Sequence, residues 1–230
     1  MVNKSIMVQG TGSHVGKSVA VAAICRILKQ DGYSVCPFKS QNMALNSFAT
    51  SSGGEMGRAQ VMQAEACGIA PEVSMNPILI KPVKDKEAQI IFMGKVVKNM
   101  TAAEYNEKKV YFLDKIRETV IGLKERFDYV VIEGAGSPAE INLLDNDIVN
   151  MRTAEISRSP VILLGDIDKG GIFASFYGTV KILPRRYRKY IKALLINKFR
   201  GDISLLKPGI NWVEKKLKLP VIGTIPYYNN

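Results

Sequence analysis

Residues 9–18 read Gln9-Gly10-Thr11-Gly12-Ser13-His14-Val15-Gly16-Lys17-Ser18. The apolar residues 6–8 precede this segment, and a helical pattern at residues 19–24 follows it. A strand, a glycine-rich turn ending in Gly-Lys-Ser and a helix together form a phosphate-binding loop, in which backbone N–H groups surround an anion at the helix N-terminus. We therefore predict that residues 11–18 bind nucleotide phosphates, with Lys17 on the terminal phosphates and the Ser18 hydroxyl on Mg²⁺.

The loop departs from the common spacing at one position. The usual motif has a glycine five residues before Gly16, but this position is Thr11, and the glycines are Gly10 and Gly12. The segment is therefore a variant loop. A chance glycine turn before a core helix is the alternative, and the flanking strand and helix disfavour it.

The composition predicts one globular domain over residues 1–230. Hydrophobic residues make up 47% of the chain and charged residues 23%, which is enough for a sizeable core without disulfides or metals. No apolar run approaches the ~20 residues that span a bilayer, and the short first apolar segment is not a signal peptide. Cys25, Cys36 and Cys67 share no metal-type spacing, and Cys25 and Cys36 lie in apolar patterns, so we expect these two as buried thiols. The odd, low cysteine count without a secretion signal favours a cytoplasmic protein, and we expect no membrane partner.

The net charge of +11 raises the question of a nucleic-acid partner. The positive residues are mostly scattered, however, and the one dense cluster, residues 185–189, has the character of a solvated face. A polyanionic small substrate would also be steered by a positive surface. Nucleic acid is therefore not the partner that we expect.

Strand and helix patterns alternate along the chain. Strand patterns lie at residues 4–8, 34–38, 75–82, 89–97, 129–132, 161–164, 191–196 and 221–225. Helical patterns lie at residues 17–31, 55–67, 147–156, 171–183 and 203–217, and one further long helix is capped by Thr101 with Glu104 completing a capping box. Residues 39–54 read as a polar loop. The alternation predicts an α/β fold with a mostly parallel sheet and helices on both faces.

Polar side chains follow the ends of five predicted strands, where ligands of such sheets bind. Glu133 ends an apolar strand, like the acidic residue of a Walker B segment, and is a candidate Mg²⁺ ligand unless it is simply a solvated acid. Lys39 can stabilise a transferring phosphoryl group or an acidic substrate, or it is a surface lysine. Glu55 is a second candidate Mg²⁺ ligand, although the helix dipole alone favours an acid at a helix start. Asn197 can present its amide to a purine base, but asparagine is also a common turn residue.

His14 is the only histidine, and it lies inside the phosphate loop. A Cys-His pair or a Ser-His-Asp triad is therefore not expected elsewhere in the chain, nor is thiol-based hydrolysis of glutamine. The remaining chemistry is phosphoryl transfer with a metal and carboxylates.

Several segments carry a family resemblance that spans residues 9 to about 209. The loop at residues 10–18 is similar to that of dethiobiotin synthetases, a group of P-loop NTPases. Longer segments resemble cobyric acid synthase, at residues 38–47, 54–60, 75–77, 133–143, 147–151, 166–171 and 196–206.

This resemblance implies an amide ligase, specifically the synthetase domain of cobyric acid synthase. Such a domain uses ATP and Mg²⁺ to amidate peripheral carboxylates of adenosylcobyrinic acid a,c-diamide through an acyl phosphate, in cobalamin biosynthesis. The resemblance also implies a corrinoid polycarboxylate as substrate and a glutamine amidotransferase domain or subunit as the source of ammonia. A homodimer is expected by resemblance only.

The resemblance implies roles for individual residues. The catalytic candidates are Lys17, Lys39, Asp166 and Asp168. Asn197 and Lys198 would face the adenine, and Ser18, Glu133 and Glu55 would hold Mg²⁺. The candidates on the substrate side are Gln41, Asn42, Glu140, Asn142, Asp145 and Asp147.

Two alternative functions remain open. A ParA/MinD-like switch ATPase would bind DNA or membrane, but such proteins carry a second lysine near the first glycine of the loop, and residues 10–12 contain none. A stand-alone ligase of the dethiobiotin synthetase type is disfavoured by the segments at residues 41–44 and 197–202.

Overall fold

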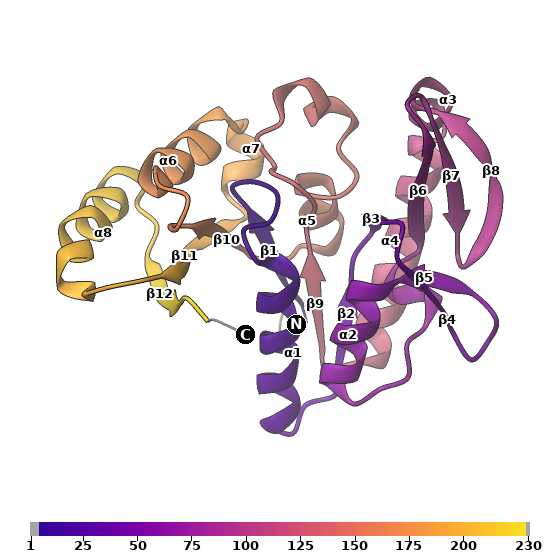
Figure 1. Ribbon diagram of the computed structural model, residues 1–230, viewed down its shortest axis with the longest axis horizontal. Coiled ribbons are helices and arrows are strands. Elements are labelled where there is room, and N and C mark those ends of the chain that lie inside the picture. The colour runs from indigo at the N-terminus through magenta and orange to yellow at the C-terminus, as the bar shows by residue number, and fades with distance from the viewer. Residues whose placement is uncertain (1–4, 229–230) are drawn as a thin grey trace.

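The computed structural model describes residues 5–228, and its main sheet has six strands. Their order is β12 (Val221–Pro226), β11 (Ile191–Phe199), β10 (Val161–Asp166), β1 (Ser5–Gly10), β9 (Tyr129–Glu133) and β2 (Val35–Phe38). Every pair of neighbours is parallel, which confirms the predicted sheet (Figure 1).

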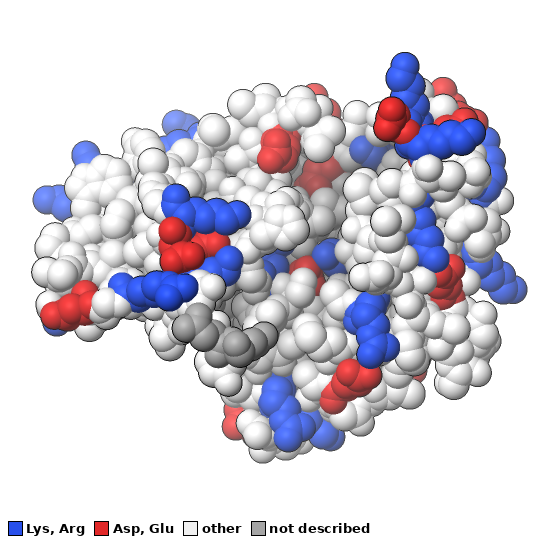
Figure 2. Space-filling view, viewed as in Figure 1, with Lys and Arg blue, Asp and Glu red and all other residues white. Residues whose placement is uncertain are grey.

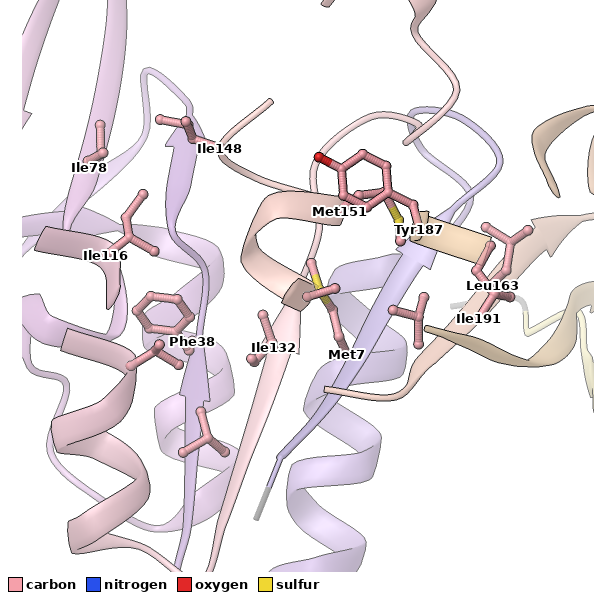
Figure 3. Packing of buried hydrophobic residues seen from close by; sticks show 14 of the residues in the cluster. Met7, Phe38, Ile78, Ile116, Ile132, Ile148, Met151, Leu163, Tyr187 and Ile191 are labelled. Carbon is pink, nitrogen blue, oxygen red and sulfur yellow. The ribbon is translucent and has the colours of Figure 1, made fainter. Parts of the chain in front are cut away.

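Helices cover both faces of this sheet, because both faces of its strands are apolar. Val8, Val131 and Leu164 pack with the buried side of helix α1 (Lys17–Gln30). Their chain neighbours, such as Met7 and Ile132, point to the opposite face, as the labelled side chains of Figure 3 show. Among the helices that supply buried side chains to that second cluster are α4 (Lys109–Arg126), α5 (Met151–Ser157), α6 (Ile172–Ile182) and α8 (Ile203–Leu217).

A smaller mixed sheet stands beside the edge strand β2 (Figure 1). It contains β3 (Gln41–Met43), β6 (Ile78–Lys84), β7 (Glu87–Phe92) and β8 (Lys95–Thr101), in that order. A separate two-stranded ribbon pairs β4 (Ser47–Ala49) with β5 (Glu55–Gly57). Short helices η1 (Val73–Met75), η2 (Ile141–Asn146) and α7 (Arg185–Arg188) lie within the connections.

The prediction of a polar loop over residues 39–54 is therefore partly wrong, because this segment contains two short strands, β3 and β4, and leads into a third, β5. The helix predicted over residues 55–67 begins only at Arg58 and is α2 (Arg58–Cys67), because Glu55–Gly57 is paired as β5. The strand predicted over residues 89–97 is two strands, β7 and β8. They turn at Met93 and Gly94, which have φ values of 47° and 79°.

The helix that begins after Thr101 also differs from the prediction. The capping box of Thr101 and Glu104 is confirmed, but the helix α3 (Ala102–Glu107) ends after two turns. Lys108 separates it from α4, so the predicted single helix is two helices. The helix predicted over residues 147–156 begins at Met151, because the Asp147 carboxylate accepts hydrogen bonds from the N–H groups of the turn before it.

The order of the strands positions the site. From β1 the chain runs to β2 at the edge, returns to β9 beside β1, and then crosses to β10 on the other side of β1. The loops after β1, β9 and β10 therefore diverge from one place at the carboxyl edge, where such sheets form a ligand crevice. Within residues 5–228, no helix is long and apolar enough to cross a membrane.

Candidate active site

The phosphate loop, residues 10–18, connects β1 to α1 as predicted. A Cβ atom on Gly10 would lie 2.6 Å from Cγ2 of Val15 and 2.9 Å from Nζ of Lys17, so only glycine fits there. Thr11 has no positive φ, and its N–H donates to the carbonyl of Leu164 on β10, at 2.9 Å. The glycine of the common motif is therefore not needed at position 11.

Lys17 lies inside this loop. Its Nζ donates to the carbonyl oxygens of Gly12, at 2.8 Å, and Gly136, at 2.9 Å. Burial lowers the pKa of Lys17 to about 8; the nearby Glu133 carboxylate opposes this shift and Lys39 adds to it. The free N–H groups at the start of α1 and this ammonium provide the donors that a phosphate group requires.

Glu133 is the centre of a buried hydrogen-bond network. It ends β9 and is 1% exposed. One carboxylate oxygen accepts from Ser18 Oγ and from Lys39 Nζ, each at 2.8 Å. The other oxygen accepts from the amides of Gln63, at 2.6 Å, and Gln60, at 3.2 Å. The alternatives of a solvated acid at Glu133 and a surface lysine at Lys39, which is 7% exposed, are therefore wrong.

The sequence analysis missed Gln60 and Gln63 as parts of the site. Both lie on α2, three residues apart and fully buried. The sequence held one signal for these site residues: two glutamines occupy one face of a helix whose other buried residues are apolar. Buried amides need polar partners, so such a pair indicates a polar group nearby. They hold the Glu133 carboxylate from the side away from Ser18 and Lys39.

A cavity of about 790 Å³ opens above this network. Figure 2 shows a hollow at the centre of this face, with charged side chains inside it. The predicted residues that line the cavity are Ser13, His14, Gly16, Lys17, Ser18, Lys39, Gln41, Asn42, Glu133, Glu140 and Asp147. Its other walls include Met43, Lys109, Pro138, Leu143 and Leu144.

Asp166 and Asp168, which were predicted as catalytic residues, do not line this cavity. Asp166 ends β10 and Asp168 follows it, on the other side of the phosphate loop. Asp166 accepts from Lys198 Nζ at 2.6 Å, and Asp168 accepts from Arg200 Nε at 3.2 Å. Both carboxylates therefore form ion pairs with basic residues, Lys198 of β11 and Arg200 of the loop that follows it.

Asn197 and Lys198 hold the outer side of the phosphate loop. The Asn197 amide donates to the carbonyl of Val15 at 2.8 Å, and Lys198 Nζ donates to the carbonyl of His14 at 3.1 Å. Neither residue lines the cavity. Both residues are thus hydrogen-bonded to the phosphate loop, on the side of the loop that faces β11.

Glu55 also lies apart from the cavity, on β5. Its carboxylate accepts hydrogen bonds from Lys81 of β6 and Ser47 of β4. Partial burial raises the pKa of Glu55, but these hydrogen bonds outweigh it and hold the pKa below its ordinary value. Glu55 therefore does not line the cavity with Ser18 and Glu133. The alternative, that Glu55 is an acid favoured at the start of a helix, is wrong because Glu55 lies in a strand.

The predicted substrate residues are divided. Asn142 and Asp145 are part of η2 but do not line the cavity. Gln41 accepts from the hydroxyl of Tyr105, and Asn42 donates to Gln60 at 3.1 Å. Asp147 accepts backbone hydrogen bonds from residues 149, 150 and 152, so its carboxylate shapes the loop that it belongs to.

The oxygen atoms of Ser18 and Glu133 at the cavity floor are suitable ligands for Mg²⁺. Hydroxyl and carboxylate oxygens are its preferred protein ligands, and Ser18 Oγ and Glu133 already lie 2.8 Å apart. Over the described part of the chain, no cluster of three or more His, Cys, Asp or Glu residues could hold a metal by itself.

Comparison with known proteins identifies the family. Residues 6–230 match the family model described as the CobQ/CobB/MinD/ParA nucleotide binding domain. The chain belongs to this family. It is 59% identical over 222 residues to cobyric acid synthase of Clostridium tetani, covering 96% of this chain and 45% of that protein. It is 59% identical over 227 residues to cobyric acid synthase of Dehalococcoides mccartyi, covering 99% and 45%.

These relatives confirm the resemblance to cobyric acid synthase, and the chain spans about 45% of their length. Solved structures resemble it in fold alone. The signal recognition particle receptor FtsY of Elizabethkingia anophelis superposes with a TM-score of 0.58 at 16% identity, over 99% of this chain and 60% of that one. FtsY of Thermotoga maritima gives 0.54 at 14% identity, over 97% and 62%.

Proposed function

We propose that this chain is the ATP-dependent synthetase part of a cobyric acid synthase. In this role it converts peripheral carboxylates of adenosylcobyrinic acid a,c-diamide into amides, in cobalamin biosynthesis. The observation that carries the proposal is the meeting of Lys17, Ser18, Lys39 and Glu133 at the floor of one cavity. The relatives that are 59% identical support the choice of reaction.

In the proposed reaction, an oxygen of the acceptor carboxylate attacks the γ-phosphorus of ATP, and the bond to the leaving ADP breaks. Ammonia then attacks the carbon of the acyl phosphate, which expels phosphate, and the nitrogen loses a proton to give the amide. Lys17 and Lys39 supply the positive charge that stabilises the transferring phosphoryl group. A bound Mg²⁺, held by Ser18 and Glu133, would neutralise phosphate charge.

We assign Asn197 and Lys198 to the adenine side of the nucleotide. They bind the outer side of the phosphate loop, away from the cavity, so a nucleotide whose phosphates occupy the loop can reach them with its base. Asp166 and Asp168, which pair with Lys198 and Arg200, would then act on that side as positioning residues.

We propose that ammonia comes from a glutamine amidotransferase domain or subunit. His14 lies in the phosphate loop and the three cysteines are buried, so the described chain offers no exposed thiol beside a histidine. The three unpaired thiols also support our proposal of a cytoplasmic location.

The family model covers MinD and ParA as well as CobQ and CobB. The lack of a lysine in residues 10–12 and the identity to cobyric acid synthases favour the ligase. DNA binding that weakens steeply with salt would revive the switch ATPase.

The test supplies the chain with ATP, Mg²⁺, cobyrinic acid a,c-diamide and ¹⁵N-ammonium. Mass spectrometry should detect labelled amides that depend on ATP. Lys17→Ala should lower turnover by about 100-fold or more, because it removes a donor to the phosphates, while circular dichroism stays unchanged. No labelled product, even after a glutaminase domain is added, would contradict the substrate assignment. Undiminished ADP release by Lys17→Ala would contradict the loop assignment.

A further inference from the structure

Three lysines line the cavity, and one of them has no role in the proposed reaction. Lys17 is bonded to two carbonyls of the loops and Lys39 to Glu133. The third is Lys109, the first residue of α4. The neighbouring charges that act on Lys17 are Glu133 and Lys39, whereas the one that acts on Lys109 is Asp147.

Lys109 makes no hydrogen bond and no ion pair with any residue between 5 and 228. Its Nζ lies over the ring of Tyr105, 6.0 Å from the ring centroid. The Asp147 carboxylate acts on Lys109 only through space: no ion pair joins the two, and the Asp147 oxygens accept from the N–H groups of Val149, Asn150 and Arg152. Within residues 5–228, the Lys109 ammonium is therefore a cation with no direct hydrogen-bond or ion-pair partner at the wall of the cavity.

This position is unfavourable for the fold alone. Lys109 is half-buried, and burial lowers its pKa, with Asp147 acting in the opposite direction. It also starts a helix, where the helix dipole disfavours a cation. A half-buried lysine at the start of a helix, with no direct partner for its ammonium, breaks the rules of local structure, and such exceptions are expected at binding sites.

The wall around Lys109 is partly apolar. Met43 is 64% exposed and Leu143 is 55% exposed, and both line the same cavity together with Pro138 and Leu144. Large apolar side chains left exposed inside a hollow favour a ligand with an apolar body. Combined with the unpaired ammonium, they fit a bulky ligand that carries an anionic group on an apolar frame.

We propose that Lys109 binds a second, non-reacting carboxylate of the acceptor and thereby orients the acceptor so that another carboxylate reaches the phosphate near Lys39. This inference rests on the proposed function, since it names how the acceptor is held. The apolar frame of the acceptor contacts Met43 and Leu143. A charged hydrogen bond of this kind changes affinity by about 10- to 100-fold.

The test compares Lys109→Met with Lys108→Met. Methionine keeps most of the length of lysine and removes its charge. Lys108 is the exposed neighbouring residue and does not line the cavity, so its substitution is a matched control. Lys109→Met should raise the KM for cobyrinic acid a,c-diamide about 10- to 100-fold and leave the KM for ATP unchanged. Lys109→Arg should restore most of the acceptor affinity, and Lys108→Met should resemble the unsubstituted chain.

A binding measurement without ATP separates this inference from the proposed reaction. Calorimetric titration should show tighter binding of cobyrinic acid a,c-diamide to the unsubstituted chain than to Lys109→Met. A corrinoid whose carboxylates are all amides should bind both equally. If the unsubstituted chain forms no amide but binds the diamide more tightly than Lys109→Met does, the proposed reaction fails and the role of Lys109 in binding stands. Equal diamide affinity of Lys109→Met and Lys108→Met, or no binding to any variant, overturns the role of Lys109.

Discussion

Glu133 and Lys17 illustrate how single charges are balanced at the site. Glu133 is buried, but two lysines, a hydroxyl and two amides surround it, so its negative charge is compensated within hydrogen-bond reach or close to it. Lys17 is bonded to two carbonyl oxygens, and burial lowers its pKa to about 8.

The depressed pKa of Lys17 predicts a pH dependence of nucleotide binding. Burial is its main cause, and the pKa of about 8 means that the ammonium is present at pH 7 and mostly lost at pH 9. A phosphate requires the ammonium, so ATP affinity should fall about tenfold between pH 8 and pH 9.5, with proton uptake on binding at the higher pH. Calorimetry in two buffers of different ionisation enthalpy measures both quantities.

Lys17→Arg is the control for this pH dependence. Its guanidinium stays charged over the whole range, so the affinity of this variant, whatever its value at pH 7, should change little up to pH 9.5. An equally steep fall in Lys17→Arg would assign the dependence to another group.

At the scale of elements, the phosphate loop explains its own irregular sequence. The close approach between backbone and side chains occurs at Gly10, one residue before the position where the common motif has glycine. Position 11 instead donates a backbone hydrogen bond to β10. The loop is thus tied to the sheet on the side where the nucleotide base is assigned.

This geometry predicts different effects for two glycines. Gly10→Ala places a Cβ 2.6 Å from Val15 and 2.9 Å from Lys17 Nζ, which should cost about 1–3 kcal/mol in unfolding free energy and weaken ATP binding. The Cβ of Gly12→Ala would meet nothing within 4 Å, so the unfolding free energy of this variant should stay within about 0.5 kcal/mol of that of the unsubstituted chain. Urea unfolding and nucleotide titration measure the two effects. Equal losses in both variants would refute the close contact at Gly10.

At the scale of the whole molecule, stability should be unevenly distributed. β1 is bonded to β10 on one side and β9 on the other, and five of its six residues are buried. The β4 and β5 ribbon has three residues in each strand and no other strand partner in the described structure. Backbone hydrogen bonds at the centre of a packed sheet open only with the whole fold, whereas those of a short ribbon open locally.

Hydrogen exchange followed by mass spectrometry tests this prediction. Peptides containing β1 should exchange only through global unfolding, for which about 5–15 kcal/mol is typical, and peptides containing β4 should exchange far faster. ATP should slow exchange further at the phosphate loop and leave the β4 and β5 ribbon unchanged. Equal protection of the two regions would contradict the division of the molecule into a rigid sheet and a mobile ribbon.

Much of the fold could be predicted from local patterns. Patterns of neighbouring residues predicted several elements correctly. These are the strand, loop and helix around residues 9–18, the apolar strands at residues 129–132 and 161–164, and the capping box at Thr101. The errors fall where pairing with distant segments decided the structure. Glu55 became a strand residue because it pairs opposite Ala49, and the loop after β2 gained a strand because Gln41 lies beside Ile78.

The sequence by itself determined the α/β class, the phosphate loop, the carboxylate at the end of β9 and the resemblance to cobyric acid synthase. The tertiary structure decided which of the predicted polar residues share one cavity. Pairing of β9 with β1 brings Glu133 to Ser18 across 115 residues, and the return of the chain to β10 carries Asp166 to the other side of the loop. It also brought in Gln60, Gln63 and Lys109. The physical reason is that periodicity and turn chemistry act between near neighbours, whereas the meeting of loops depends on the order of strands in the sheet.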